Sequence, residues 1–112
     1  MAKHPKFQMF TGSNGKIYFR LTAKNGQPVL TSQGYADKSG ARKGIESVRK
    51  NGPNDDRYDR KTAANGQFYF NLTAANQQTI GTSEMYTTSA ARDKGVESVK
   101  TNAPGAEVEE EG

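Results

Sequence analysis

The sequence contains no cysteine, no tryptophan, one histidine and no long hydrophobic run. Without cysteine, the chain can form no disulfide, hold no metal through thiolates and use no cysteine nucleophile. No segment approaches the roughly 20 apolar residues of a membrane-spanning helix, and the first ten residues lack the apolar core of a signal peptide. We therefore expect a cytoplasmic protein that is neither exported nor anchored in a membrane.

Residues for catalysis and for cofactor binding are also scarce. A hydrolytic triad needs a base beside its nucleophile, and the single histidine, His4, lies close to the N-terminus. No GxxxxGK[ST] phosphate loop is present. The acidic residues Asp55, Asp56 and Asp59 are more typical of a solvated turn than of a cation site. We expect no enzyme activity, no metal and no cofactor.

The composition is that of a small, polar, folded domain. The chain has 112 residues, of which 32% are hydrophobic, and its mean hydropathy is −0.92. Five tyrosines and five phenylalanines are more than a disordered polar chain usually carries. This length fits one domain, which we assign to residues 1–112.

An internal repeat organises the sequence. Residues 15–53 align without a gap on residues 66–104, and 18 of the 39 positions are identical. The repeats extend over about 7–57 and 58–108, and we expect the acidic tail at 109–112 to be disordered. A unit of about fifty residues is near the lower limit for an independent core, so we expect the two repeats to share one core with pseudo-two-fold symmetry.

Each repeat begins with a pattern of strands. Apolar residues alternate with polar ones around Phe19 and around Phe70, which is the period of a half-buried strand. We predict strands over 6–12, 16–24 and 27–34 and, in the second repeat, over 58–63, 67–75 and 78–85. Asn14-Gly15 and Asn25-Gly26 favour two-residue type I′ turns. Gln77 replaces the second glycine in repeat 2, where we expect a looser turn.

The period then changes to that of a helix. Asp37 can cap a first helix that carries Ala41, Ile45 and Val48 on one side and ends at Asn51-Gly52-Pro53. In the second repeat Thr87 or Thr88 can cap a helix that ends at residues 102–104. Gly44 and Gly95 lie in mid-helix, where glycine costs about 1 kcal/mol relative to alanine. We interpret both as sites of close packing between helix and sheet rather than as ligand sites.

These motifs resemble those of the YegP-like family of small bacterial proteins, including its tandem-repeat members. The shared pattern is NG-x-F/Y-x-F-x-L-x-A-x-N, then TS with an aromatic residue, then GIESV or GVESV closed by N-x-P. The resemblance covers Lys6 to about Val108 and departs at Gln77 and in the acidic C-terminus. It implies an α+β fold of two tandem β3-α-β repeats in a single, mostly antiparallel sheet, with both helices on one face. The resemblance also implies that the last strand of each repeat, within 54–60 and 105–110, is exchanged onto the other. The family has no assigned activity.

Charge is unevenly divided between the two repeats. The net charge is +4 for the whole chain, but residues 1–53 carry +8 and residues 54–112 carry −4. Three interpretations remain open: solvated helix faces, an anionic partner of the first repeat, or electrostatic docking of one half on the other. The recurring pairs Glu46-Ser47 and Glu97-Ser98 are explained by ion pairs along an exposed helix face, or by a symmetric binding feature.

If both helices cover one face of the sheet, strand alternation places a set of polar and aromatic side chains on the other face. Aromatic and arginine side chains on an open sheet can stack on and neutralise single-stranded nucleic acid. We therefore predict a non-enzymatic module that binds an anionic partner such as RNA or single-stranded DNA. The alternatives are cross-strand pairing without a ligand, or a protein interface. We expect a monomer, with a homodimer as the alternative. The candidate residues are Tyr18, Arg20, Thr22, Tyr69, Asn71 and Thr73.

Overall fold

A computed structural model describes residues 4–110 and contains seven strands and two long helices. The predicted order of three strands and one helix in each repeat is confirmed. Within residues 4–110, no helix is long and apolar enough to cross a membrane. The elements are β1 (Lys6–Thr11), β2 (Ile17–Thr22), β3 (Pro28–Ser32), α1 (Lys38–Asn51), β4 (Tyr58–Thr62), β5 (Phe68–Thr73), β6 (Thr79–Thr82), α2 (Ser89–Asn102) and β7 (Glu107–Glu110), with 3-10 turns at Asp55–Arg57 and Ala103–Gly105.

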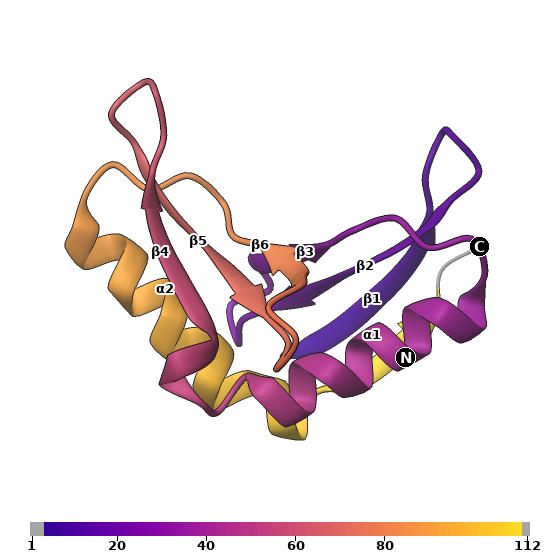
Figure 1. Cartoon of the computed structure of the whole chain (residues 1–112). Coiled ribbons are helices and arrows are strands. Elements are labelled where there is room, and N and C mark those ends of the chain that lie inside the picture. Colours follow the sequence, from indigo (N-terminus) through magenta and orange to yellow (C-terminus); the bar gives the residue numbers. More distant parts are fainter. Residues whose placement is uncertain (1–3, 111–112) are drawn as a thin grey trace.

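All seven strands form one mixed sheet in the order β4-β5-β6-β3-β2-β1-β7. The pair β1–β7 is parallel and the other pairs are antiparallel. The two repeats meet at the centre, where β3 pairs with β6, so equivalent strands lie at equal distances from this junction. Both helices lie on the same side of the sheet, while the β1–β2 and β4–β5 hairpins rise on the opposite side like two arms (Figure 1).

Each helix is followed by an edge strand, but of these two strands only β7 pairs with the other repeat. The exchange that the resemblance implied for residues 54–60 is therefore not seen as a separate strand. After α1 the chain forms β4 beside β5, and after α2 it forms β7 beside β1. The strands β4 and β7 are not equivalent. Strand β4 is the first strand of repeat 2 and the counterpart of β1, whereas β7 has no counterpart in the described part of the chain. Strand β7 is therefore an additional edge strand. Its parallel pairing with β1 makes the sheet mixed, and its presence at one edge only breaks the two-fold symmetry of the sheet.

The predicted disorder of residues 109–112 is wrong for its first half. Glu109 and Glu110 belong to β7. The Lys6 ammonium lies 2.6 Å from a Glu109 carboxylate oxygen, and Arg42 of α1 pairs with Glu110. These cations offset the like-charge repulsion on which the prediction rested. Residues 111–112 lie outside the described residues.

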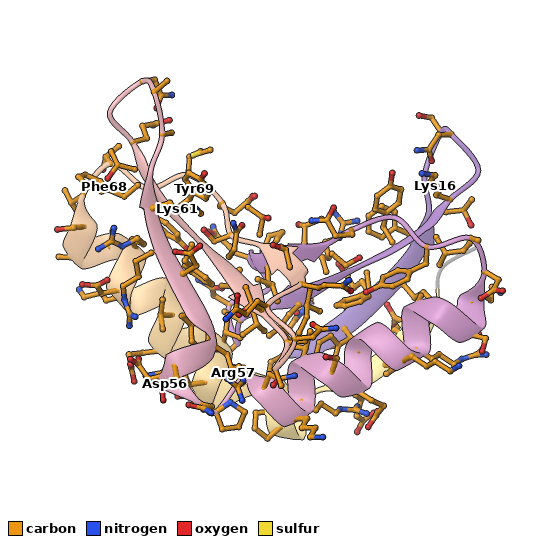
Figure 2. The ribbon with its side chains drawn as sticks, in the orientation of Figure 1. Lys16, Asp56, Arg57, Lys61, Phe68 and Tyr69 are labelled. Carbon is orange, nitrogen blue, oxygen red and sulfur yellow. The ribbon has the colours of Figure 1, made fainter. Side chains whose placement is uncertain are left out.

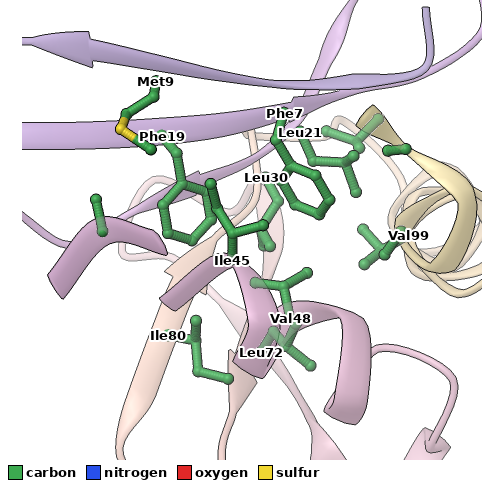
Figure 3. Close-up of a cluster of buried hydrophobic side chains, with 14 of the residues drawn as sticks. Phe7, Met9, Phe19, Leu21, Leu30, Ile45, Val48, Leu72, Ile80 and Val99 are labelled. Atoms are coloured by element: carbon green, nitrogen blue, oxygen red, sulfur yellow. The ribbon is translucent and has the colours of Figure 1, made fainter. Parts of the chain in front are cut away.

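One hydrophobic core fills the space between the sheet and the helices (Figure 3). The inward-facing strand residues Phe19 and Phe70, which are equivalent in the two repeats, are fully buried. Both helices supply side chains to this core, which confirms that the repeats share it. Its largest members are Phe7, Met9, Phe19, Leu21 and Leu30 from repeat 1, Ile45 and Val48 from α1, and Phe70, Leu72, Val96 and Val99 from repeat 2.

The helix caps and helix glycines follow the predictions. Asp37 accepts a hydrogen bond from the Gly40 amide, and Thr88 caps α2 in the same way. A Cβ at Gly44 would lie 2.9 Å from Cε2 of Phe19 and would collide with the Tyr35 hydroxyl. The predicted close approach of helix and sheet is thus confirmed, and Gly95 has the same environment beside Tyr86.

The predicted type I′ turns are wrong. The glycine of each Asn-Gly pair has a positive φ, but the asparagine does not. Asn25 instead accepts a hydrogen bond from the Gln27 amide through its side chain, and the Gly26 amide bonds to Ala23 O at 2.9 Å. This asparagine turn needs only its last residue in the left-handed region.

The looser turn expected at Gln77 is also wrong. Gln77 has a φ of 69° and occupies the glycine's place. Its amide bonds to Ala74 O at 2.8 Å, as the Gly26 amide does to Ala23 O. The sheet register on both sides of the turn fixes the backbone path, so the side chain is held in a conformation that usually favours glycine.

Candidate binding surfaces

The helix-free face of the sheet carries a polar row that crosses all seven strands. Directly opposed residues share a face, so the register places Arg20 and Asn71, both predicted from the sequence, in the same row. The row ends in an acidic residue at each edge. Its members are Asp59, Asn71, Thr82, Thr31, Arg20, Gln8 and Glu109.

An aromatic and cationic cluster lies beside this row in the first repeat. Phe10 and Tyr18 stack with ring centroids 5.8 Å apart and planes 20° apart. The Arg20 guanidinium carbon lies 4.5 Å from the Phe10 centroid, and all three side chains are half-buried. Sequence reasoning missed Phe10, although the alternation of β1 puts it on the face opposite the buried Phe7 and Met9.

The second repeat does not reproduce this cluster. Lys61, Tyr69 and Asn71 stand where the first repeat has Phe10, Tyr18 and Arg20. The Lys61 ammonium lies 3.3 Å from Asp59, and Asn71 accepts a hydrogen bond from the Thr82 hydroxyl at 2.8 Å. Figure 2 shows Lys61 and Tyr69 on the β4–β5 arm, opposite the hairpin that carries Lys16. Tyr69 has no aromatic partner among residues 4–110.

Two predicted binding residues bond to neighbouring backbone. The pairing of β2 with β3 shifts between Leu21 and Thr22, and Thr22 is only 1% exposed. Its hydroxyl donates to Lys6 O and accepts from the Lys6 amide. Thr73, at the matching shift in β5, donates to Arg57 O at 3.0 Å. The prediction that Thr22 is displayed for a ligand is wrong, because the local irregularity buries its side chain and turns its hydroxyl toward the backbone of β1. Thr73 is half-buried, as Tyr18 and Arg20 are, and its role in binding stays a prediction.

Half of the ten cations in residues 1–53 lie on α1, on the other side of the sheet from the Phe10–Tyr18–Arg20 cluster. Five cations belong to this helix: Lys38, Arg42, Lys43, Arg49 and Lys50. Arg42 pairs with Glu110, and Arg49 pairs with Glu46. The open sheet face and the basic surface, which sequence reasoning combined, are therefore separate surfaces.

Two equivalent grooves lie between a helix of one repeat and a strand-connecting turn of the other. We define groove 1 as the space between α1 and the β5–β6 turn at 74–78, and groove 2 as the space between α2 and the β2–β3 turn at 23–27. The recurring Glu-Ser pairs line these grooves. Repetition in the sequence was the signal for them, but only the tertiary structure brings helix and turn together.

Burial and ion pairs shift the pKa of three groups near the helices. Burial raises the pKa of the Tyr35 and Tyr86 hydroxyls, which lie beside the helix glycines. Hydrogen bonds from Lys100 and Arg60 lower the pKa of Asp55. Within residues 4–110 no three His, Asp or Glu side chains lie close enough to share a metal ion.

A family model and several curated relatives match this chain. The model of a domain of unknown function, DUF1508, matches the chain twice, over residues 13–59 and 63–110. The chain is thus a tandem DUF1508 protein, and it belongs to the UPF0339/YegP family. It is 52% identical over 106 residues to a Stutzerimonas stutzeri protein described as the UPF0339 protein in the ptx operon 5′ region, covering 95% of this chain and 96% of that protein.

Two of its relatives have solution NMR structures. YegP from Escherichia coli, described as a protein of unknown function, superposes with a TM-score of 0.89 at 47% identity, over 98% of this chain and 93% of that one. A UPF0339 protein from Shewanella oneidensis gives a TM-score of 0.88 at 46% identity, over 94% and 89% of the two chains.

Proposed function

We propose that the chain is a non-enzymatic binding module that contacts single-stranded nucleic acid through the helix-free face of its sheet. The observation that carries this proposal is the stacked Phe10–Tyr18 pair with Arg20 over the Phe10 ring. Aromatic faces stack on bases of any sequence for about 1–3 kcal/mol per base, and a guanidinium can bind a phosphate or stack on a base itself. A cytoplasmic location is part of the proposal.

The charge of this face sets the kind of binding that we expect. Arg20, Lys16 and Lys61 are its accessible cations, whereas the buried Lys6 is paired with Glu109 at one edge and Asp59 lies 3.3 Å from Lys61 at the other. With about three phosphates neutralised, the salt dependence for a single strand has a log–log slope of only about −2. We therefore expect weak binding without base-specific contacts, in which stacking contributes more than charge.

The test is a titration of isotope-labelled protein with single-stranded DNA and RNA oligonucleotides of mixed sequence, at two salt concentrations. The expected result is saturable amide shifts at Phe10, Tyr18 and Arg20, with smaller shifts at Tyr69. Arg20→Gln should weaken binding. Arg42→Gln is the matched control, because it removes the same charge from α1 on the other side of the sheet.

A Tyr18→Ala/Arg20→Ala double variant gives the decisive outcome. If it keeps a native-like amide spectrum and full affinity for the oligonucleotide, the proposal is wrong. Unchanged spectra of the original protein at low salt would also refute it. Those results would favour the protein-interaction alternative, for which affinity changes little with salt.

A further inference from the structure

The two grooves retain the same chemistry although the repeats have diverged elsewhere. Both contain the helix lysine and serine that recur in the sequence, Lys43 and Ser47 in groove 1 and Lys94 and Ser98 in groove 2. Both also receive an asparagine from the facing turn, Asn76 or Asn25. In each repeat the helix lysine lies one turn from the helix serine, so each groove combines elements that no single repeat could provide.

Each groove also holds a second lysine, but from opposite walls. Groove 1 has Lys50 on its helix and Ala75 on its turn. Groove 2 has Thr101 at the helix position and Lys24 at the turn position. The lysine lost from one wall is thus replaced from the other, and the number of groove lysines stays the same. None of these four lysines forms an ion pair within residues 4–110.

The polar groups of groove 1 are arranged mainly as donors. The Asn76 side-chain oxygen accepts from the Gln78 amide at 3.0 Å, which leaves its NH2 group to donate. The Ser47 hydroxyl oxygen accepts from Asn51 Nδ2 at 3.1 Å, which leaves its hydrogen to donate. The one carboxylate, Glu46, pairs with Arg49. Two ammonium groups, an amide and a hydroxyl are therefore available to an anion.

We propose that these grooves are a pair of phosphate sites. In groove 1 a phosphoryl group lies between Lys43 and Lys50 and bonds to the serine and asparagine donors. In groove 2 Lys24 and Lys94 line adjoining parts that share Asn25 and Ser98, so the phosphoryl group bonds to these two donors beside one lysine at a time. Ammonium groups act as point charges for phosphate, which has enough oxygens for all four donors. The part of groove 1 that both lysines line has a volume of about 420 Å³, and the part of groove 2 that Lys94 lines about 450 Å³, which fits a ligand of nucleotide size. This site lies on the helix side and is independent of the Phe10–Tyr18–Arg20 cluster.

The two grooves should differ in affinity. Glu84 lines groove 2 where Gln33 lines groove 1. A carboxylate at this position repels an anion and also accepts the hydrogen bonds that a phosphate would receive. Groove 1 should therefore fill first, and Glu84→Gln should bring groove 2 closer to the affinity of groove 1.

The test is a titration of isotope-labelled protein with inorganic phosphate, adenosine monophosphate and a short single-stranded oligonucleotide, with sodium chloride matched for ionic strength. Phosphate and the monophosphate are expected to shift the amides of Ser47 and Asn76 saturably, and those of Ser98 and Asn25 at higher concentration. Lys43→Gln should weaken groove 1 by about tenfold. Lys38→Gln, on the same helix but outside the groove, should leave the affinity unchanged.

Equal shifts with matched sodium chloride, or equal losses in the Lys43→Gln and Lys38→Gln variants, would overturn the proposal. If adenosine monophosphate binds the grooves at least as tightly as the oligonucleotide does, the ligand is a small phosphorylated molecule. Shifts in the grooves with the oligonucleotide alone would assign the phosphoryl group to a nucleic-acid backbone. Shifts confined to Tyr18 and Arg20 would refute the phosphate sites and leave the proposed function intact.

Discussion

The two repeats of this chain have the same elements but use their helix-free faces differently. In repeat 1 this face carries Phe10 stacked on Tyr18 beneath Arg20, and in repeat 2 Lys61 and Asn71 replace the phenylalanine and the arginine. Most core positions stayed apolar, as at Phe19 and Phe70, because both repeats pack against one shared core. The exceptions in the strands are Met9 and Leu30, whose equivalents in repeat 2 are Arg60 and Gly81. Packing therefore constrained the helix side of the sheet more than the helix-free face.

The outer edges of the two repeats differ as well. In repeat 1 the edge of β1 is covered by β7, whereas in repeat 2 β4 is the last strand of the sheet. Around β4, Arg60 lies 3.0 Å from Asp55 and 3.4 Å from Asp93, and Lys100 lies 2.6 Å from Asp55. One edge is therefore completed by a strand and the other is held by exposed ion pairs.

Removing the charge that joins β7 to β1 should have the largest effect. The side chains of Lys6 and Glu109 are only 6% and 16% exposed, and Glu109→Gln leaves the ammonium buried without its carboxylate. We expect a loss of about 3 kcal/mol in the free energy of unfolding, measured by urea denaturation. Glu110→Gln is the matched control: its pair with Arg42 is more exposed and should be worth at most about 1 kcal/mol. Equal losses for the two variants would contradict a special role for the Lys6 pair.

Alanine at the helix glycines should destabilise both repeats, although alanine is the better helix former. Gly44→Ala should cost about 2 kcal/mol because the new methyl group meets the Tyr35 hydroxyl and Phe19. Gly95→Ala should cost somewhat less, since Phe70 is 3.2 Å away rather than 2.9 Å. Thermal denaturation measures both. Adding Tyr35→Phe to Gly44→Ala should recover part of the loss, and no recovery would show that the hydroxyl is not the obstacle.

The matching turns allow a smaller, reciprocal test. Gln77→Gly should stabilise the protein by about 1 kcal/mol, because glycine adopts the observed positive φ without the penalty of a side chain. Gly26→Gln should destabilise it by at least as much, since the His4 ring lies 3.2 Å from where its Cβ would be. Chemical denaturation with Gln77→Ala as the control separates backbone strain from side-chain contacts. A Gln77→Gly variant less stable than Gln77→Ala would show that the turn is unstrained.

The smallest expected effect is a pH dependence of the ion pairs around β4. Because the pKa of Asp55 is lower in the folded protein than its ordinary 3.8, its contribution is present above that value and is lost as the pH falls through the folded value. Asp55→Asn should therefore reduce stability slightly at neutral pH and flatten the loss of stability between about pH 5 and 3. Denaturation midpoints across this range measure it, with Asp56→Asn as the neighbouring control. If Asp55→Asn leaves the pH dependence of stability unchanged, the lowered pKa of Asp55 does not contribute to it.

The candidate site was predictable only in part. Alternation in β2 and β5 placed Tyr18, Arg20, Tyr69 and Asn71 on one face, and the register confirms this arrangement. The same rule failed for Thr22, because the shift after Leu21 in the pairing with β3 cannot be inferred from one strand's own pattern. The prediction missed Phe10 because it considered only the strands around Phe19 and Phe70, although β1 has the same length and alternation as β2.

The amino-acid sequence by itself determined the repeat, which is a property of the sequence alone. It also determined the cap at Asp37, the cap of α2 to within Thr87 or Thr88, and the inward faces of the strands, because these depend on neighbours within a few residues. Only the tertiary structure decided that β7 joins β1, that Gln77 keeps a left-handed backbone and that each helix faces the other repeat's turn across a groove. These features depend on contacts between residues far apart in the chain. Their energies become available only after the sheet and both helices have assembled around the shared core.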